Sequence, residues 1–243
     1  MPASESPLSS APIGLNPLEG QSVILVRANP DYLDFIHDIY TNNDFMNLYR
    51  LAQDRALPKT ELKDRLQQEA TQLPQNLKRI EWVIIKKSPS ENNPIGLAAI
   101  ADYQIHHNRA ELLLGISNPS ERHTLHSLET ALLVLDFAFN IIRLHKLISY
   151  VYGYNLKAQK NTLHLGFTQE ALLKEHYFTP QGFIDLYQNR LLEQEFRSNN
   201  KLAKLSLRLL GRDITQKNRL KTEVLGKQEL DHLTSQLKKS LRT

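Results

Sequence analysis

Three short apolar runs, each close to the next along the chain, constrain the fold of this protein most. They span residues 81–87 (EWVIIKK), 95–103 (IGLAAIADY) and 110–116 (AELLLGI). Turn-forming residues such as Asn, Pro and Ser separate them. Apolar runs bounded by such residues are typical of β-strands, and loops this short join antiparallel neighbours. The sequence therefore predicts an antiparallel meander of three strands near the middle of the chain.

The hydrophobic period changes directly after this meander. Apolar residues recur at helical spacing over residues 125–143, which predicts a long helix. Residues 146–152 (KLISYVY) return to a strand pattern, and a shorter helix over 155–165 ends at Gly166, a common left-handed helix stop. Further strands are expected at 22–27, 169–178 and 183–189, and further helices from Asn29 and over 58–73. Strands interleaved with helices predict a mixed α/β (α+β) fold.

The two ends of the chain differ in composition from its middle. Residues 1–20 are rich in Pro and Ser without a basic start, so we expect a disordered arm and not a signal peptide. Residues 198–243 carry 11 Lys and Arg against 4 Asp and Glu, whereas residues 1–197 carry 19 against 22. Leucines between the basic residues predict basic amphipathic helices. This tail is either a solvated extension of the domain over 21–197 or an arm that docks an acidic protein or a nucleic acid.

The residue types present exclude several chemistries. The chain has no cysteine, which excludes disulfides, thiolate metal sites and a cysteine-bound acyl intermediate. Its histidines and carboxylates have no zinc-site spacing, and it has no glycine motif for nucleotide phosphates, so no metal site is predicted. The most apolar stretch, residues 131–142, is shorter than the roughly 20 residues that span a bilayer. We therefore expect a cytoplasmic protein without a transmembrane segment.

Short motifs in the second half of the chain have an informative order and spacing. They are Asp136-Phe137-Ala138-Phe139, Leu144-His145-Lys146, Asn155, Leu165-Gly166-Phe167, and then Phe183, Asp185 and Glu195-Phe196. This pattern resembles that of the RimJ/RimL-like acetyltransferases of the GNAT superfamily. The resemblance covers about residues 22–197. It implies a GNAT fold, with a mixed, splayed sheet of six or seven strands flanked by helices.

The resemblance also implies that acetyl-CoA, or another acyl-CoA, is the co-substrate. Its pantetheine arm is expected beside the strand 110–116, up to Ile116, and its pyrophosphate on backbone amides where the long helix begins. The corresponding loop consists of Arg122, His123, Thr124, Leu125, His126 and Ser127. Relatives have a glycine at the position of Leu125, and often one at the position of His123, because glycine lets the backbone approach phosphate closely. Either side chains such as Arg122 replace that contact, or the segment is a solvated helix start in a domain that binds no coenzyme A.

Direct transfer of an acyl group to an amine needs a base. By its resemblance to an acidic position on the cofactor strand of the family, Glu111 is expected to be this base, acting directly or through water. Its alternative role is that of a glutamate exposed on one face of a strand. Asp102, Glu81, His123 and His126 are weaker candidates, because nothing in the sequence fixes their geometry.

The leaving thiolate needs an acid, and here the chain departs from its relatives. Many relatives carry Asn-x-x-Ser after the strand 146–152, whereas this chain has Asn155 followed by Ala158 and lacks the hydroxyl. Asn155 is expected either to bind the cofactor or to order the strand end. Tyr152 or Tyr154 is expected to protonate the thiolate, and the alternative for both is packing at the rim of the site.

Three functions remain open from the sequence. The first is an acetyl-CoA-dependent N-acyltransferase whose amine acceptor is a protein N-terminus, a small amine or an amino sugar. The second is a catalytically inactive GNAT-fold domain whose basic tail docks a partner. The third is an acyltransferase that uses acyl carrier protein, whose acidic surface the tail would attract.

Overall fold

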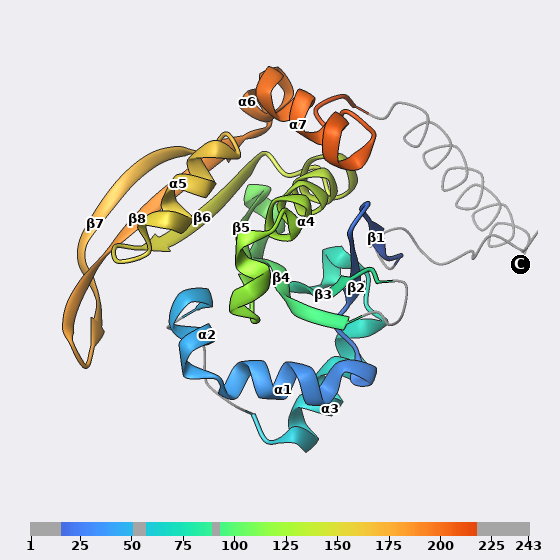
Figure 1. Ribbon diagram of the computed structural model, residues 1–243, viewed down its shortest axis with the longest axis vertical. Coiled ribbons are helices and arrows are strands. Elements are labelled where there is room, and N and C mark those ends of the chain that lie inside the picture. Colours follow the sequence, from blue (N-terminus) through green and yellow to red (C-terminus); the bar gives the residue numbers. More distant parts are fainter. Residues whose placement is uncertain (1–15, 51–56, 89–92, 218–243) are drawn as a thin grey trace, which may run out of the picture.

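The protein is built around one mixed sheet (Figure 1). The computed structural model describes residues 16–50, 57–88 and 93–217. Within these residues the strands form a single eight-stranded sheet in the order β1-β2-β3-β4-β5-β6-β8-β7. They are β1 (Leu18–Glu19), β2 (Val23–Arg27), β3 (Ile80–Lys86), β4 (Asn93–Gln104), β5 (Arg109–Ile116), β6 (Lys146–Tyr152), β7 (Thr168–Thr179) and β8 (Gly182–Leu192). The mixed α/β class is confirmed, and the number of strands is corrected from six or seven to eight. The two-residue strand β1 pairs with β2, although β1 lies within residues 1–20, which composition predicted to be a disordered arm.

Helices cover both faces of this sheet. They are α1 (Leu33–Thr41), α2 (Asn43–Tyr49), α3 (Lys59–Ala70), α4 (His126–Asp136), α5 (Leu156–His164), α6 (Glu193–Ser198) and α7 (Asn200–Leu210), with 3-10 turns η1 (Pro30–Tyr32), η2 (Pro74–Asn76), η3 (Ile105–His107) and η4 (Pro119–His123) and a π-helical turn η5 (Phe137–Ile141). Trp82 and Ile84 of β3 pack in the core under α4, whereas Val83 and Ile85 pack in the core under α1 to α3. Since β3 is covered on both sides, its sequence is a continuous apolar run and does not alternate.

The predicted meander is present, and it leads to a gap in the sheet. β2, β3, β4 and β5 pair antiparallel in chain order. β5 then pairs with β6 in parallel, but only from Arg109 to Glu111 on β5 and from Lys146 to Ile148 on β6. Both strands continue beyond this pairing, so they diverge from Glu111 onward. The predicted neighbourhood of residues 110–116 and 146–152, and the splay between them, are confirmed.

The long helix after the meander begins within one residue of its predicted start. α4 runs from His126 to Asp136 and continues as the π-helical turn η5. It packs against β2, β4 and β5 on the face opposite α1 to α3. Its buried Glu129 accepts a hydrogen bond from the backbone amide of Ser22 at 2.9 Å and a second one from the hydroxyl of Ser22. This contact ties the first turn of α4 to the start of β2.

The last two strands form a hairpin that projects from the body of the molecule (Figure 1). β8 pairs with the whole of β6 through its residues Leu186–Leu192, and β7 lies at the outer edge of the sheet. Gly166 has a φ of +91°, a left-handed conformation that glycine adopts without strain, and it turns the chain from α5 into β7. Phe178 and Phe183 face each other near the turn of the hairpin and are 73% and 63% exposed.

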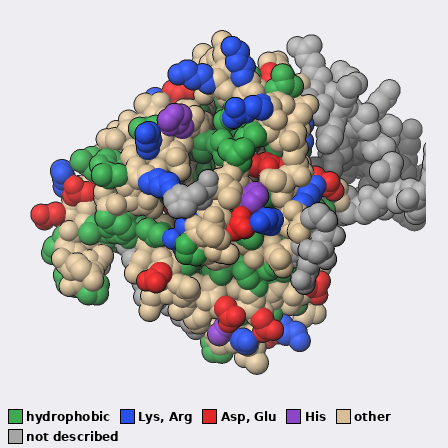
Figure 2. All heavy atoms as spheres, in the orientation of Figure 1, with side chains coloured by type: hydrophobic (Ala, Val, Ile, Leu, Met, Phe, Trp, Pro, Cys, Tyr) green, Lys and Arg blue, Asp and Glu red, His purple; other side chains and the backbone are tan. Residues whose placement is uncertain are grey.

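The hydrophobic core continues past the domain boundary that the charge distribution indicated at residue 197. Leu202, Leu209 and Leu210 of α7, and Ile214 beyond it, are buried in the core that contains α4. The basic side chains Lys201, Lys204 and Arg208 of α7 are exposed, and Figure 2 shows Lys and Arg side chains gathered over this end of the molecule. The folded domain therefore extends past residue 197 and includes Ile214. The charge count did not indicate this, because it adds up the exposed basic face of α7 and ignores its buried leucines. The remainder of the predicted basic tail, residues 218–243, lies outside the described residues.

Among the helices that the structure describes, none combines the length and the apolar character that a membrane span requires.

Candidate active site

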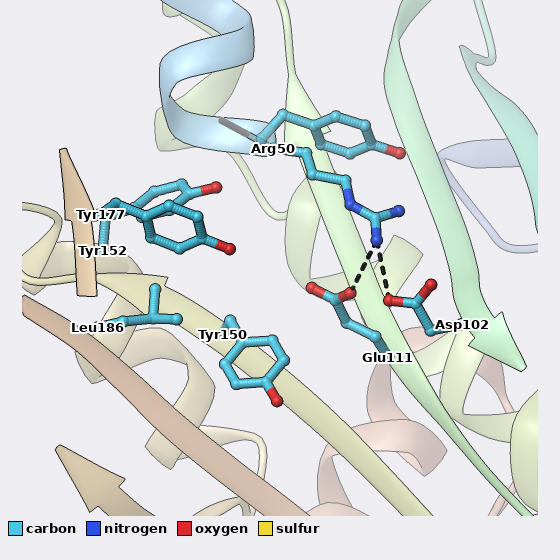
Figure 3. Close-up of a pocket in the computed structure, with 8 residues that line it drawn as sticks. Arg50, Asp102, Glu111, Tyr150, Tyr152, Tyr177 and Leu186 are labelled. Carbon is cyan, nitrogen blue, oxygen red and sulfur yellow. Dashed lines mark hydrogen bonds and ion pairs between the residues drawn. The ribbon is translucent and has the colours of Figure 1, made fainter. Parts of the chain in front are cut away.

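A cavity of about 170 Å³ opens where β5 and β6 separate. The described residues that line it are Tyr49, Arg50, Asp102, Glu111, Tyr150, Tyr152, Tyr177 and Leu186. Figure 3 shows that Arg50, Asp102 and Glu111 form one wall, and that the tyrosines of β6 and β7 with Leu186 form the opposite wall. The cavity therefore has a charged side from the end of α2, β4 and β5, and an aromatic side from β6, β7 and β8.

Glu111 is the most deeply buried carboxylate of this cavity. It lies on β5 at the last position that pairs with β6, and its side chain is 9% exposed. Burial raises the pKa of the Glu111 carboxyl to about 7, because water no longer solvates the charged form; Arg50 opposes this rise, and Asp102 reinforces it by its negative charge and a hydrogen bond. A carboxyl with this pKa changes its protonation state near neutral pH. The sequence-predicted base is thus in the cavity, and it is not an exposed strand residue.

A kink in β4 brings Asp102 to the same wall. The pairing of β4 with β5 is interrupted between Ala101 and Gln104, and Asp102 has a φ of +46°, in the left-handed region that Asp tolerates better than most residues. Arg50, which follows the last residue of α2, donates to Asp102 with 2.9 Å between Nη2 and Oδ2. The same Nη2 lies 3.6 Å from Oε2 of Glu111. One guanidinium therefore bridges two carboxylates.

A close helix packing positions Arg50. A Cβ on Gly115 of β5 would lie 2.6 Å from the ring of Phe45 and 3.0 Å from the ring of Tyr49. The absence of a side chain at Gly115 lets α2 approach β5 closely. The backbone amide of Arg50 donates to the carbonyl of Met46 at 2.9 Å, which completes the last turn of α2. The Arg50 side chain points from there into the cavity (Figure 3).

The aromatic wall consists of three tyrosines, of which the sequence analysis found only Tyr152. The Tyr152 ring is buried, and its centroid lies 5.8 Å from that of Tyr177 in an edge-to-face arrangement. Tyr150 lies two residues earlier on the same face of β6, and burial, with the nearby Glu111, raises the pKa of its hydroxyl. The spacing of Tyr150 and Tyr152 was a signal that could have identified both. No local pattern identifies Tyr177 or Arg50, which reach the cavity through the tertiary fold.

Tyr154 does not line the cavity. It is 50% exposed, its ring stacks on Tyr152 with 5.8 Å between centroids, and its hydroxyl donates to the backbone carbonyl of Asn47 in α2. Tyr154 therefore connects the end of β6 to α2. Of the two tyrosines proposed as acids, only Tyr152 lies with Glu111.

Glu81, a weaker candidate base, belongs to a buried cluster behind the cavity. It accepts hydrogen bonds from the hydroxyls of Tyr40 and Tyr49 at 2.5 and 3.3 Å, and it pairs with Arg79. Burial next to Glu81 raises the pKa of the Tyr40 hydroxyl further above its ordinary value. This carboxylate is fully engaged in holding α1 and α2 on the sheet, so it is not available as a base.

The predicted phosphate loop begins where β5 ends. The guanidinium of Arg122 donates from Nε to the carbonyl of Ile116 at 2.9 Å and from Nη2 to the carbonyl of Ser117 at 3.2 Å. Arg122 therefore closes the loop between β5 and η4. This contact shapes the loop and directs two of the guanidinium nitrogens at the protein itself. His123 is the last residue of η4.

The remaining loop residues lie just before α4 or in its first turn. The hydroxyl of Thr124 donates to the carbonyl of Glu121 at 2.7 Å and accepts from the amide of His126 at 3.3 Å. The His126 ring nitrogen Nδ1 lies 2.9 Å from Oε2 of Glu121. Leu125 is 55% exposed, so the core does not require its side chain. Ser127 is the second residue of α4, where helical backbone amides have no partner within the helix.

Asn155 caps a helix. Its side-chain oxygen accepts a hydrogen bond from the amide of Ala158 at 3.2 Å, and α5 begins at the next residue. Of the two roles expected from the sequence, ordering the end of the strand accounts for this contact. The side-chain oxygen of Asn155 is thereby engaged at the end of β6.

The backbone at the gap is suited to an extended thiol cofactor such as coenzyme A. From Leu112 to Ile116, β5 pairs with β4 on one side, whereas its pairing with β6 stops at Glu111. The second edge of this segment therefore faces the gap, and the first turn of α4 lies beyond its end. Backbone groups along β5 and amides at a helix start are suitable partners for an amide-containing arm and a phosphate. Among the described residues, no group of three or more His, Cys, Asp and Glu is arranged to hold a metal ion.

Comparisons with known proteins agree with this geometry. The family described as "Acetyltransferase (GNAT) domain" matches residues 22–168. Among curated proteins, no sequence matches the chain significantly. The structure is similar to that of spermidine N-acetyltransferase from Vibrio cholerae in complex with CoA and spermine, with a TM-score of 0.63 and 22% identity, covering 72% of this chain and 97% of that chain.

Two further structures of that kind are similar to this one. A chimera of the Vibrio cholerae spermidine N-acetyltransferase has a TM-score of 0.62 and 20% identity, and the match covers 74% of this chain and 100% of that chain. The dodecameric enzyme in an intermediate state has a TM-score of 0.61 and 22% identity, covering 73% and 99%. At these identities the likeness is one of fold.

Proposed function

Since this chain belongs to the GNAT acetyltransferase superfamily, we propose that it transfers the acetyl group of acetyl-CoA directly to a primary amine. The observation that carries this proposal is the buried carboxyl of Glu111, with a pKa of about 7, at the point where the sheet opens. A group that gains and loses a proton near neutral pH, inside a cavity with an aromatic wall, has the properties of a general base.

The cofactor side of the proposal rests on the gap and on the start of α4. The free edge of β5 from Leu112 to Ile116 would hold the pantetheine arm by backbone hydrogen bonds, and the amides of Ser127 and its neighbours would hold the pyrophosphate. Arg122 keeps the intervening loop closed. When bound, acetyl-CoA supplies the thioester carbonyl that the amine attacks.

The chain itself would move the protons. The acceptor amine attacks the thioester carbonyl in its neutral form, and Glu111 in its ionised form accepts the proton that the nitrogen loses as positive charge develops on it. Tyr152, on the opposite wall, is the residue suited to give a proton to the leaving sulfur, in place of the hydroxyl that Ala158 lacks. Tyr154 holds the end of β6 against α2 and takes no part in proton transfer.

A non-catalytic binding domain is the second candidate, and two observations favour it. Leu125 occupies the position where relatives have glycine, and the hydroxyl of Thr124 already accepts a hydrogen bond from one amide of the first turn of α4. Both reduce what the loop can offer to a phosphate. Binding of acetyl-CoA to the purified protein separates the two candidates.

The proposed function is tested in two steps with the full chain. Calorimetry with acetyl-CoA measures cofactor binding, and release of free thiol in the presence of primary amines measures transfer. We expect binding, amine-dependent thiol release, and a loss of at least about a hundredfold in kcat for Glu111→Gln, the range of general base catalysis. The matched control is Glu61→Gln on the exposed side of α3, which should leave kcat unchanged. Absence of acetyl-CoA binding, or equal rates in the two variants, would exclude the proposal.

A further inference from the structure

Arg50 is the one positively charged residue among the described residues that line the cavity, and the proposed proton transfers do not use it. It comes from the end of α2 and is held by two carboxylates, Asp102 at 2.9 Å and Glu111 at 3.6 Å. Its side chain is 24% exposed, so it is partly shielded from solvent. Figure 3 shows the guanidinium directed between the two acids on the charged wall. The positive charge of Arg50 therefore lies between the two carboxylates to which an amine acceptor could otherwise bind.

This arrangement limits the positive charge that the cavity can accept. An ammonium group that leaves water needs a counter-charge, and a second ammonium needs another. Arg50 lies closer to Asp102, at 2.9 Å, than to Glu111, at 3.6 Å, so Glu111 is the carboxylate better able to receive the reacting nitrogen. Among the described residues that line the cavity, no further carboxylate is present to balance a second positive charge on the acceptor, and such a charge near Arg50 is repelled by it.

The opposite wall is suited to an apolar body. Tyr150, Tyr152 and Tyr177 present rings to the cavity, and Leu186 lies on the same wall between Tyr150 and the other two. Aromatic rings take apolar groups and the edges of other rings, and they also tolerate one nearby cation. The cavity volume of about 170 Å³ is close to that of an engineered protein cavity of about 150 Å³ that holds benzene. The space therefore accommodates one ring or a short alkyl chain.

We infer that the acceptor of this protein is a small primary amine with a single positive charge and a compact apolar or aromatic body, and that Arg50 is the specificity-determining residue that disfavours diamines and polyamines. This inference rests on the proposed function for the direction in which the amine binds. It distinguishes this chain from the enzyme of similar fold whose structure contains spermine.

The test uses two amines with the same carbon chain, of which one has a second terminal ammonium group. Butylamine and putrescine have the same four-carbon chain, and putrescine carries a second ammonium group. Each is titrated calorimetrically into the full chain saturated with coenzyme A, for the wild type, Arg50→Met, Arg50→Lys and the surface control Arg208→Met. Arg208→Met makes the same chemical change on the exposed face of α7. Phenethylamine is titrated as a probe of the aromatic wall.

We expect the wild type to bind butylamine at least about tenfold more tightly than putrescine, and phenethylamine more tightly than either. Arg50→Met should shift the ratio toward putrescine by at least about tenfold, while Arg50→Lys and Arg208→Met keep the wild-type ratio. Equal or stronger binding of putrescine by the wild type overturns the inference, and so does an unchanged ratio in Arg50→Met or the absence of binding of all three amines. The wild-type ratio decides the matter even if Arg50→Met does not fold.

Kinetics separate this inference from the proposed function. Amine binding with the expected charge preference, but without thiol release from acetyl-CoA, contradicts the proposed transferase and leaves the acceptor class supported. Thiol release with putrescine and butylamine at equal kcat/KM contradicts the acceptor class and leaves the transferase supported.

Discussion

Glu111→Gln should stabilise the folded protein at high pH while it removes the proposed base. Burial gives the Glu111 carboxyl a pKa of about 7 instead of its ordinary 4.5. The native state therefore keeps the proton over a pH range in which the unfolded chain has lost it. The stabilisation from this proton is complete below about pH 4.5 and is lost as the pH rises to about 7. Each pH unit is worth about 1.36 kcal/mol, so the wild type should lose about 3 kcal/mol across this window.

A glutamine side chain has nearly the same shape but cannot ionise. We expect the free energies of unfolding of wild type and Glu111→Gln to be similar near pH 4.5, and the variant to be more stable by about 3 kcal/mol near pH 8. Urea denaturation at several pH values measures this difference, with unchanged m-values as the check that the unfolded states are comparable. Glu61→Gln, on the solvent side of α3, should change stability by less than about 0.5 kcal/mol at every pH.

A difference between wild type and Glu111→Gln that does not vary with pH would refute the reasoning, because it would mean that Glu111 titrates alike in the folded and unfolded chains. A variant that is less stable near pH 8 would refute it as well, since ionised Glu111 would then be net stabilising through Arg50. In either case a pKa near 7 could not support the assignment of the base.

Three other changes test the proposed acid, the predicted phosphate loop and the domain boundary. Tyr152→Phe should lower kcat at least about tenfold with little change in acetyl-CoA binding, whereas Tyr154→Phe should change kcat less than about twofold. Equal losses of kcat in the two variants, measured by thiol release, would contradict the proposal that Tyr152 is the acid. Leu125→Gly should keep or tighten acetyl-CoA binding measured by calorimetry, because the backbone can then approach phosphate, and a loss of binding would show that the leucine itself contacts the ligand. Leu209→Ala should cost about 2–5 kcal/mol in urea denaturation, because Leu209 is buried in the core beside α4, and a cost under about 0.5 kcal/mol would mean that α7 does not belong to the domain.

Much of the fold could be predicted because its signals are local. Residues 146–152 coincide with β6, and the change of hydrophobic period after the meander placed the start of α4 within one residue. The short helix α2 was not predicted, since its seven residues are held by a single Asn42 cap and by packing on Gly115. α7 was assigned to the tail because net charge counts the exposed basic face of an amphipathic helix and not its buried leucines.

The candidate site was predictable only in part, for a physical reason. Glu111 and Tyr152 lie on strands whose order the family resemblance supplied, so the sequence already brought them near each other. Arg50 and Tyr177 reach the cavity from a helix end and from an edge strand, and no spacing along the chain relates them to Glu111. Their positions follow from long-range packing, which a single sequence does not encode in any local pattern.

The three-residue contact between β5 and β6 has a consequence for how freely this chain can vary. The groups that β5 presents along the gap are main-chain amides and carbonyls, which are the same for every residue except proline. A groove built in this way stays intact under most substitutions, provided that the strands keep their register. Side-chain identity is then needed only at a few places, such as Glu111 at the closed end of the gap. A protein can therefore share about a fifth of its residues with another and still have the same fold.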